Sequence, residues 1–197
     1  MAKAVSLLSS PFYLPIIGLA ALFTFSYLSL LPFTYKVFVL IMVYLFTCLL
    51  PTTLIRLYHS YHGWTPFEFG ARERRIIPYV VSILCYFTCY YVMMLMHMPH
   101  LMGSIVVAAL ATQVVCAMIN MWWKISVHMA AIGAMAGSLA SFAAIFMFNP
   151  IWWLSVIIFF AGMIGSARMI LRQHTLRQIY IGFIIGVMTG AVTVITV

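Results

Sequence analysis

The chain has 197 residues, of which 66% are hydrophobic and only 6% are charged. Soluble globular domains carry about 25% charged residues, so this chain lacks the polar surface that a soluble protein needs. The composition excludes a soluble enzyme and predicts an integral membrane protein. Although the formal net charge is +8, we expect the membrane as the partner of this chain and no nucleic acid.

Seven apolar runs follow one another along the chain, separated by short polar breaks. They cover about residues 12–31, 36–56, 76–96, 101–121, 126–148, 151–170 and 178–197. A helix needs about 20 apolar residues to cross a bilayer, and these runs lack the alternation of barrel strands. We therefore predict an all-α membrane helix bundle, a single domain over residues 1–197, with about seven transmembrane helices or a core of six.

The basic residues are distributed unevenly across the predicted membrane. If the spans alternate in direction, all lysines and arginines except Lys36 fall on the side of the N-terminus. They are Lys3, Arg56, Arg72, Arg74, Arg75, Lys124, Arg168, Arg172 and Arg177. The positive-inside rule predicts that this side faces the cytoplasm, although a phosphate-binding site would gather arginine in the same way. We expect a multi-pass protein of a bacterial inner membrane.

The four cysteines, Cys48, Cys85, Cys89 and Cys116, fall inside predicted spans and form no C-x-x-C pair. Such a pattern is typical of buried, unreactive thiols and does not indicate a redox or metal site.

Ionisable side chains gather where the fifth predicted span begins. Lys124 and His128 are four residues apart, so they share one face of a helix. Ser126 stands between them, and we expect its hydroxyl to cap the helix. The amides of Ser126 and Val127 would then be available to an anion at the helix N-terminus.

A second group lies between the sixth and seventh spans. Arg168 ends one span, and His174 and Gln178, four residues apart, begin the next. Both groups fall on one side of the membrane, at the depth of a lipid headgroup. Lysine and arginine at span ends commonly reach to the interface with no further role, which is the alternative for Arg172 and Arg177. Ionisable residues near span interiors are costly, however, and indicate a functional site.

The types of side chain favour phosphate chemistry. A phosphate ester needs cations and amides to hold its charge, a nucleophile, and an acid for the departing oxygen. Two histidines, a lysine and an arginine supply these groups. A different class, a haem-binding electron carrier, would need two facing histidines, and only His128 and His174 could provide them.

The arrangement S-x-H followed by R-x5-H resembles the type-2 phosphatidic acid phosphatase superfamily. Its usual signatures are P-S-G-H and S-R-x5-H-x3-D; here Ser126-Val127-His128 and Arg168-x5-His174-x3-Gln178 stand in their places. The segments KISVHMAAIG, ARMILRQHTLRQIYIGF, TCLLP and ERRIIPY are most similar to short multi-span members from Bacteroidetes-like bacteria. The resemblance covers most of the chain from about Thr47 onward.

The resemblance implies a role for each matching residue. His174 matches the nucleophile that forms a phosphohistidine, and His128 matches the acid that protonates the leaving alcohol. Arg168 matches the arginine that holds the phosphoryl oxygens, with Ser126 and the Val127 amide in the same pocket. It also implies hydrolysis without a metal or another cofactor.

Three departures from the family pattern affect these roles. The glycine of P-S-G-H is Val127, which can still donate its amide but crowds the phosphate. The first signature, K-x6-R-P, is absent; its nearest counterpart is Arg72 to Arg75 with Pro78, so Arg72, Arg75 and Lys124 are candidate phosphate ligands. Gln178 replaces the aspartate that orients the nucleophile. We expect Gln178 to orient His174, with Glu73 or Glu68 reaching over from a long loop at residues 56–75.

The leading prediction is therefore a membrane lipid phosphatase. Its substrate would be phosphatidate, phosphatidylglycerol phosphate, an isoprenyl pyrophosphate or a lipid A phosphate. The alternative is a protein of the same family that binds lipid phosphate but is catalytically weak or inactive.

Small residues on the fifth and sixth spans predict close helix packing. Gly133-x3-Gly137, with Gly162 and Gly165, would let these two spans form a rigid core that brings His128 toward Arg168 and His174. The alternative for the same residues is a homodimer contact. Gly182 and Gly186 could serve the seventh span equally.

Overall fold

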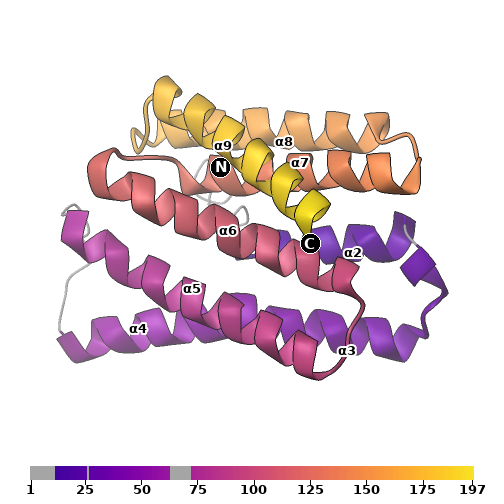
Figure 1. Cartoon of the computed structure of the whole chain (residues 1–197). Helices are drawn as coiled ribbons and strands as arrows, with labels where there is room; N and C mark the ends of the chain where they lie inside the picture. The colour runs from indigo at the N-terminus through magenta and orange to yellow at the C-terminus, as the bar shows by residue number, and fades with distance from the viewer. Residues whose placement is uncertain (1–11, 26, 63–71) are drawn as a thin grey trace.

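The computed structural model describes residues 12–25, 27–62 and 72–197. These residues form helices and no strands, which confirms the predicted all-α bundle (Figure 1). In chain order the elements are α2 (Leu14–Phe25), η1 (Tyr27–Leu30), α3 (Phe33–Tyr44), η2 (Leu45–Leu49), α4 (Leu50–His62), α5 (Arg72–Leu95), α6 (His100–Trp122), α7 (Val127–Phe146), α8 (Ile151–Ile170) and α9 (Leu176–Thr196).

Six helices of the described chain are long and apolar enough to cross a membrane. Their bounds lie within a few residues of the predicted spans. The first predicted span, residues 12–31, differs because α2 has only 12 residues and is followed by the 3-10 turn η1. Since an α-helix rises about 1.5 Å per residue, α2 is about 18 Å long and shorter than the hydrocarbon layer. The described part of the bundle therefore has six long helices and one short one.

A π-turn joins α3 and α4 into one continuous span. In η2 the N–H of Leu50 bonds to the carbonyl of Leu45, five residues earlier. Pro51 has no N–H, and its ring would collide with the carbonyl of Thr47 in an ordinary α-helix, so the wider turn relieves the conflict. The helix continues to His62. The predicted loop at 56–75 is therefore wrong for residues 56–62, and also for residues 72–75, which belong to α5; residues 63–71 lie outside the described chain.

The connections between helices lie at two opposite ends of the bundle (Figure 1). One end, drawn on the left, holds the end of α4, the start of α5 and the links 122–127 and 170–176. The other end holds the end of α2, the start of α3 and the links 95–100 and 146–151. We call the first end the basic side, because its described segments contain Arg56, Lys124, Arg168, Arg172 and Arg177. Lys36 begins α3 at the opposite end, as predicted.

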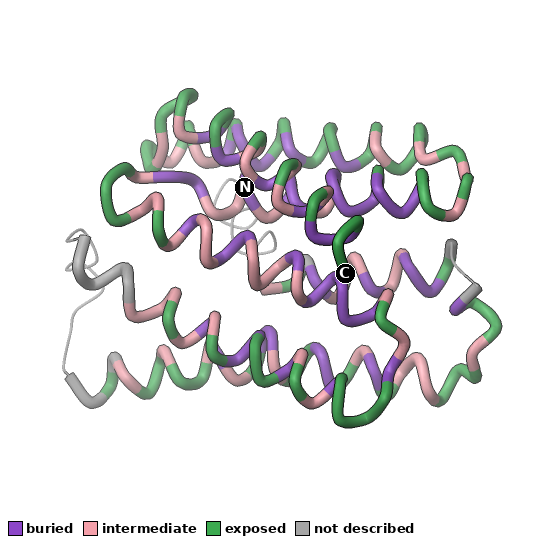
Figure 2. The backbone as a smooth tube through the Cα atoms, in the orientation of Figure 1, coloured by how far each residue is buried: buried purple, intermediate pink, exposed green. Residues whose placement is uncertain are grey.

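The most extensive helix contact is between α7 and α9, which are not neighbours in sequence. Glycines make this contact. A Cβ atom built at Gly133 would overlap the carbonyl of Phe183, and one at Gly186 would overlap the carbonyl of Ala130. Because no side chain separates the helices, their backbones touch. α7 is the most deeply buried span, as the colouring of Figure 2 shows.

This packing corrects the prediction that α7 and α8 form the rigid core through their glycines. Gly133 and Gly137 face α9, and a Cβ atom at Gly162 of α8 would meet nothing within 4 Å. The face of Gly133 and Gly137 is buried within the chain, so it is not available for a homodimer contact.

The predicted burial of the cysteines is confirmed. Cys48, Cys85, Cys89 and Cys116 are all buried and form no disulfide.

Met147, the residue that follows α7, has a left-handed backbone conformation, so a substitution there can test backbone strain. Met147 has φ 54° and its side chain is 89% exposed. Glycine adopts this conformation without steric cost, whereas an L-residue loses about 1 kcal/mol. We expect Met147→Gly to stabilise the protein by about 1 kcal/mol, measured as a rise in the thermal unfolding midpoint in detergent.

Met94→Gly is the matched control for Met147→Gly. Met94 is also exposed, but it lies within α5, where glycine costs about 1 kcal/mol. That variant should unfold at a lower temperature. Equal shifts in the two variants would contradict the strain at Met147.

Candidate functional site

The N-termini of α7 and α9 lie side by side on the basic side. The amide of Ser126 points to the carbonyl of Gln178, with 3.5 Å between nitrogen and oxygen. A Cβ atom at Gly182 would lie 2.8 Å from the carbonyl oxygen of Ser126 and 3.5 Å from Met129 Cβ. The two helices are therefore parallel from their first turns onward. His128 and His174 consequently lie at the same end of the bundle.

The end of α8 joins the two N-termini. A Cβ atom at Gly165 of α8 would lie 3.4 Å from Ile179 Cγ2 and 3.7 Å from Met129 Sδ. Met129 follows His128 directly, and Gly165 precedes Arg168 by one turn. The three helix ends that carry the predicted residues thus meet at one layer, just inside the basic side.

His174 is oriented by Gln178. Its Nδ1 atom lies 3.2 Å from Gln178 Oε1, and the same oxygen accepts the amide of Thr175 at 3.2 Å. Since Thr175 N–H can only donate, the atom facing it is the amide oxygen, which can only accept. His174 Nδ1 must then carry the proton in the neutral ring. This tautomer puts the lone pair on Nε2, the atom that would act as nucleophile.

Thr175 was not among the predicted residues. It is the N-cap of α9, and its N–H donates to the side-chain oxygen of Gln178, as in a capping box. The sequence carries the signal, since Thr175-Leu176-Arg177-Gln178 fits the pattern S/T-x-x-E/Q. Gln178 therefore has two roles: it caps the helix and orients the ring of His174.

The N-terminus of α7 offers backbone amides. Val127, His128 and Met129 form its first turn, where an α-helix leaves N–H groups without intrahelical acceptors. The first backbone bond of the helix runs from Ala130 N–H to the carbonyl of Ser126 at 3.0 Å. Such a turn attracts anions through its amides and its dipole.

Ser126 does not cap α7 as predicted. It occupies the N-cap position but makes no capping hydrogen bond through its side chain. The residue is 0% exposed, and its hydroxyl oxygen has no hydrogen-bond partner in the described chain. A buried hydroxyl without a partner costs about 1–3 kcal/mol. A bound water or a polar atom of a ligand would remove this cost.

The basic residues divide by burial. Lys124 and Arg168 are half-buried, as are His128 and His174, whereas Arg172 and Arg177 are exposed. Arg172 is the left-handed residue that ends α8, with φ 52°. The exposure of Arg172 and Arg177 fits the prediction that their side chains only extend to the membrane interface.

The start of α5 lies near the same end. Tyr79 packs against a cluster of Cys116, Ile125 and Ala130, and Ile125 precedes Ser126. The backbone of Arg75 is one turn before Tyr79. The side chains of Arg72, Glu73 and Arg75, and all of Glu68, lie outside the described part of the chain, so their predicted roles stay predictions.

Two further histidines, His97 and His100, do not extend the site. His97 and His100 flank the turn between α5 and α6, at the end of the bundle opposite His128 and His174. In the part of the chain that the structure describes, no group of three or more His, Cys, Asp or Glu side chains is placed to hold a metal ion.

Comparison with known proteins does not assign the chain to a family. No family model, curated protein or solved structure matches the chain. The chain is an integral multi-pass membrane protein by its six long apolar helices, and its chemistry must be argued from the site.

Proposed function

We propose that this protein is a membrane lipid phosphatase that works through a phosphohistidine. The observation that carries the proposal is the double hydrogen bond at Gln178 Oε1, which sets the tautomer of His174 beside the N-terminus of α7. A histidine that served only as an interfacial polar group would not need a fixed lone pair at Nε2.

Each neighbour has a role in the proposed reaction. Nε2 of His174 attacks phosphorus while the bond to the leaving oxygen breaks, and His128 gives that oxygen a proton. Arg168, Lys124 and the first-turn amides of α7 hold the phosphoryl oxygens. In the second step His128 takes a proton from water, whose oxygen attacks phosphorus and releases His174 and inorganic phosphate. The resemblance of the two motifs to type-2 phosphatidic acid phosphatases supports this assignment.

The place of the site favours a lipid substrate. The helix ends that carry it belong to membrane-spanning segments, and the surrounding surface is apolar. A phosphate group at this depth would belong to a molecule whose chains lie in the bilayer. The proposed substrates are phosphatidate, phosphatidylglycerol phosphate, an isoprenyl pyrophosphate or a lipid A phosphate, and the proposed location is a bacterial inner membrane.

Phosphate release from a panel of lipids tests the function. The purified protein in liposomes is offered each of the four substrate classes, with and without EDTA. We expect release from at least one class, unchanged by the chelator. If none of the four lipids releases phosphate, the phosphatase proposal fails.

A second candidate function is binding of lipid phosphate without hydrolysis. The observation in its favour is Gln178 itself, a neutral amide that already caps α9. An amide orients the ring but cannot stabilise the positive charge that His174 gains during attack as a carboxylate can. Lipid binding without turnover would support this candidate over the enzyme.

Gln178→Glu separates the two candidates. Glutamate has the same length, keeps both hydrogen bonds of the Gln178 oxygen and adds a negative charge beside His174 and the helix N-terminus. We expect phosphate release to rise about tenfold, since general acid–base and electrostatic contributions of single groups are at least of this size.

Gln178→Leu is the control for this substitution, because it removes both hydrogen bonds. It should lower both phosphate release and thermal stability. An unchanged rate in Gln178→Glu, together with detectable wild-type turnover, would show that the charge beside His174 is irrelevant.

A further inference from the structure

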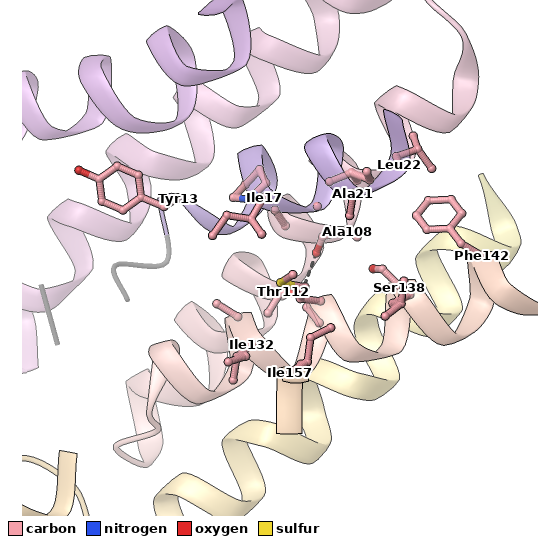
Figure 3. A pocket seen from close by; sticks show the side chains of 18 of the residues that line it. Tyr13, Ile17, Ala21, Leu22, Ala108, Thr112, Ile132, Ser138, Phe142 and Ile157 are labelled. Atoms are coloured by element: carbon pink, nitrogen blue, oxygen red, sulfur yellow. Dashed lines mark hydrogen bonds between the residues drawn. The ribbon is translucent and has the colours of Figure 1, made fainter. Parts of the chain in front are cut away.

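The bundle encloses a cavity that the proposed reaction does not use. Its volume is about 380 Å³, and its walls come from α2, α6, α7 and α8 (Figure 3). Ala21, Ala108, Ile132, Phe142 and Ile157 are among the side chains that face it. The volume falls in the range of about 300–1,000 Å³ that is typical of ligand sites.

The cavity runs the whole length of α7. Lining residues of this helix extend from Val127 in the first turn to Phe146 at the end. At about 1.5 Å per residue, this is roughly 28 Å, close to the thickness of the hydrocarbon layer. A volume of this size drawn out over such a length is long and narrow, the shape of one hydrocarbon chain.

One end of the cavity reaches the candidate site. Val127 is the neighbour of His128, and Ile164 of α8 lies one turn before Arg168; both line the cavity. None of the cations of the candidate site lines the cavity itself, but residues within one helical turn of them do, so the apolar channel ends beside the candidate site. A molecule with an anionic head and an apolar tail matches this distribution of charge.

The cavity also opens toward the lipid. Ile17 of α2 and Trp153 and Phe160 of α8 line it and are about half exposed. α2 and α8 lie on either side of α7, which forms the floor between them. A chain can therefore reach the cavity sideways from the bilayer without leaving the apolar phase.

The lining decides which occupant is favoured. Among the described residues, the lining contains no Asp, Glu, Lys, Arg or His, and only a few hydroxyl and amide groups, such as Thr112, Gln113 and Ser138. Thr112 already bonds to Ala108 and Thr189. Water needs about two to four polar partners to stay in a buried site. Only the part of the cavity near Tyr86 Oη and Gln113 Oε1, which have no hydrogen-bond partner in the described chain, offers unsatisfied polar atoms, so water is a poor occupant of the rest. An empty cavity would forfeit the dispersion contacts of its walls. A hydrocarbon chain restores those contacts.

We propose that this cavity binds one hydrocarbon chain of the lipid whose phosphate sits at the candidate site. The proposal rests on the proposed function for the identity of the headgroup. It adds that the protein draws one chain out of the bilayer into the space between α2, α6, α7 and α8, so that chain length becomes a determinant of specificity.

Photolabelling tests the cavity independently of turnover. Phosphatidate with a diazirine near the end of one acyl chain is incorporated into phosphatidylcholine vesicles that contain the protein, and the labelled peptides are identified. We expect labels on the cavity-facing residues of α2, α6 and α8, and competition by unlabelled phosphatidate but not by inorganic phosphate. Labels spread evenly over lipid-facing residues such as those of α3 and α5 would overturn the proposal.

Two substitutions narrow the cavity from different helices: Ala108→Phe in α6 and Ala21→Phe in α2. We expect each to lower labelling of the cavity peptides at least fivefold. Ala140→Phe, at an exposed position of α7, is the control and should label as the wild type does. Folding is checked by the thermal unfolding midpoint, and if neither variant folds, the label distribution in the wild type decides alone.

Turnover separates a failure of this proposal from a failure of the proposed function. The narrowed variants should lose about tenfold in phosphate release from long-chain phosphatidate but retain release from para-nitrophenyl phosphate, which has no chain. Equal release from long-chain phosphatidate in wild type and narrowed variants would refute the chain site while leaving the phosphatase intact. Cavity labelling without any phosphate release would refute the phosphatase and keep the chain site.

Discussion

Gly186→Ile is expected to destabilise the protein by about 3 kcal/mol or more. A Cβ atom at this position would overlap the carbonyl of Ala130 and lie 2.8 Å from the amide nitrogen of Ala134. Both obstacles are backbone atoms of α7, which cannot rotate away as a side chain can. Overpacking a close contact costs about 1–3 kcal/mol when neighbours can adjust, and here they cannot. Unfolding of the protein in detergent with increasing sodium dodecyl sulfate measures the change.

Gly162→Ile is the matched control. Gly162 is also a helical glycine, but nothing lies within 4 Å of its Cβ position. Isoleucine has the higher helix propensity, so this variant should be as stable as the wild type or slightly more stable. If the two variants were equally stable, close backbone contact between α7 and α9 could not be the main support of the bundle.

His174→Ala is expected to lower phosphate release at least about a thousandfold. Removal of a nucleophile eliminates the covalent step, and comparable deletions in hydrolases cost even more. A hydrogen bond to Gln178 at 3.2 Å orients the ring of His174, and the residue is only half-buried. The stability of the variant should therefore stay close to that of the wild type. Initial rates on the preferred lipid, measured beside the unfolding midpoint, give both quantities.

His100→Ala is the comparison for His174→Ala. His100 begins α6 at the opposite end of the bundle and is exposed, so its loss should leave the rate unchanged. Isotopic labelling adds a second readout, because wild-type protein quenched during turnover with ³²P-labelled substrate should carry acid-labile label that His174→Ala lacks. Full activity in His174→Ala would end the phosphohistidine mechanism.

Hydropathy predicted the long spans because the bilayer imposes length and composition on any helix that crosses it. The same pattern could not separate α2 from a full span. Residues 12–31 are apolar throughout, but the chain changes from α2 to the 3-10 turn η1 before the run ends. Composition measures how apolar a segment is, and does not measure where its backbone turns.

Helix pairing was only partly readable from the sequence. Gly133-x3-Gly137 correctly indicated a close helix contact, yet the partner is α9 and not α8. A small-residue pattern marks a surface that can be approached closely, and many helices of the same protein could use it. The partner follows from the fold as a whole, in which Gly182, Gly186 and Gly190 of α9 present a matching surface.

The candidate site was likewise only partly predictable from the sequence. Spacing predicted that Gln178 would reach His174, and the structure places the two at hydrogen-bond distance. Spacing also suggested that Ser126 would cap α7, but its hydroxyl is buried without a capping bond. A position four residues along a helix has a fixed direction, whereas the rotation of a side chain at a helix boundary depends on neighbours from other segments.

The glycine contact between α7 and α9 has a consequence for how the two histidines stay aligned. Gly182, Gly186 and Gly190 are spaced by four residues, and each fits against the backbone of α7. A small slide of α9 along its axis would drive the flanking side chains into that backbone. The next register that fits is one glycine repeat away, about 6 Å. α9 can therefore occupy only registers along α7 that differ by a full glycine repeat. His128 and His174 are either aligned or displaced from each other by that repeat.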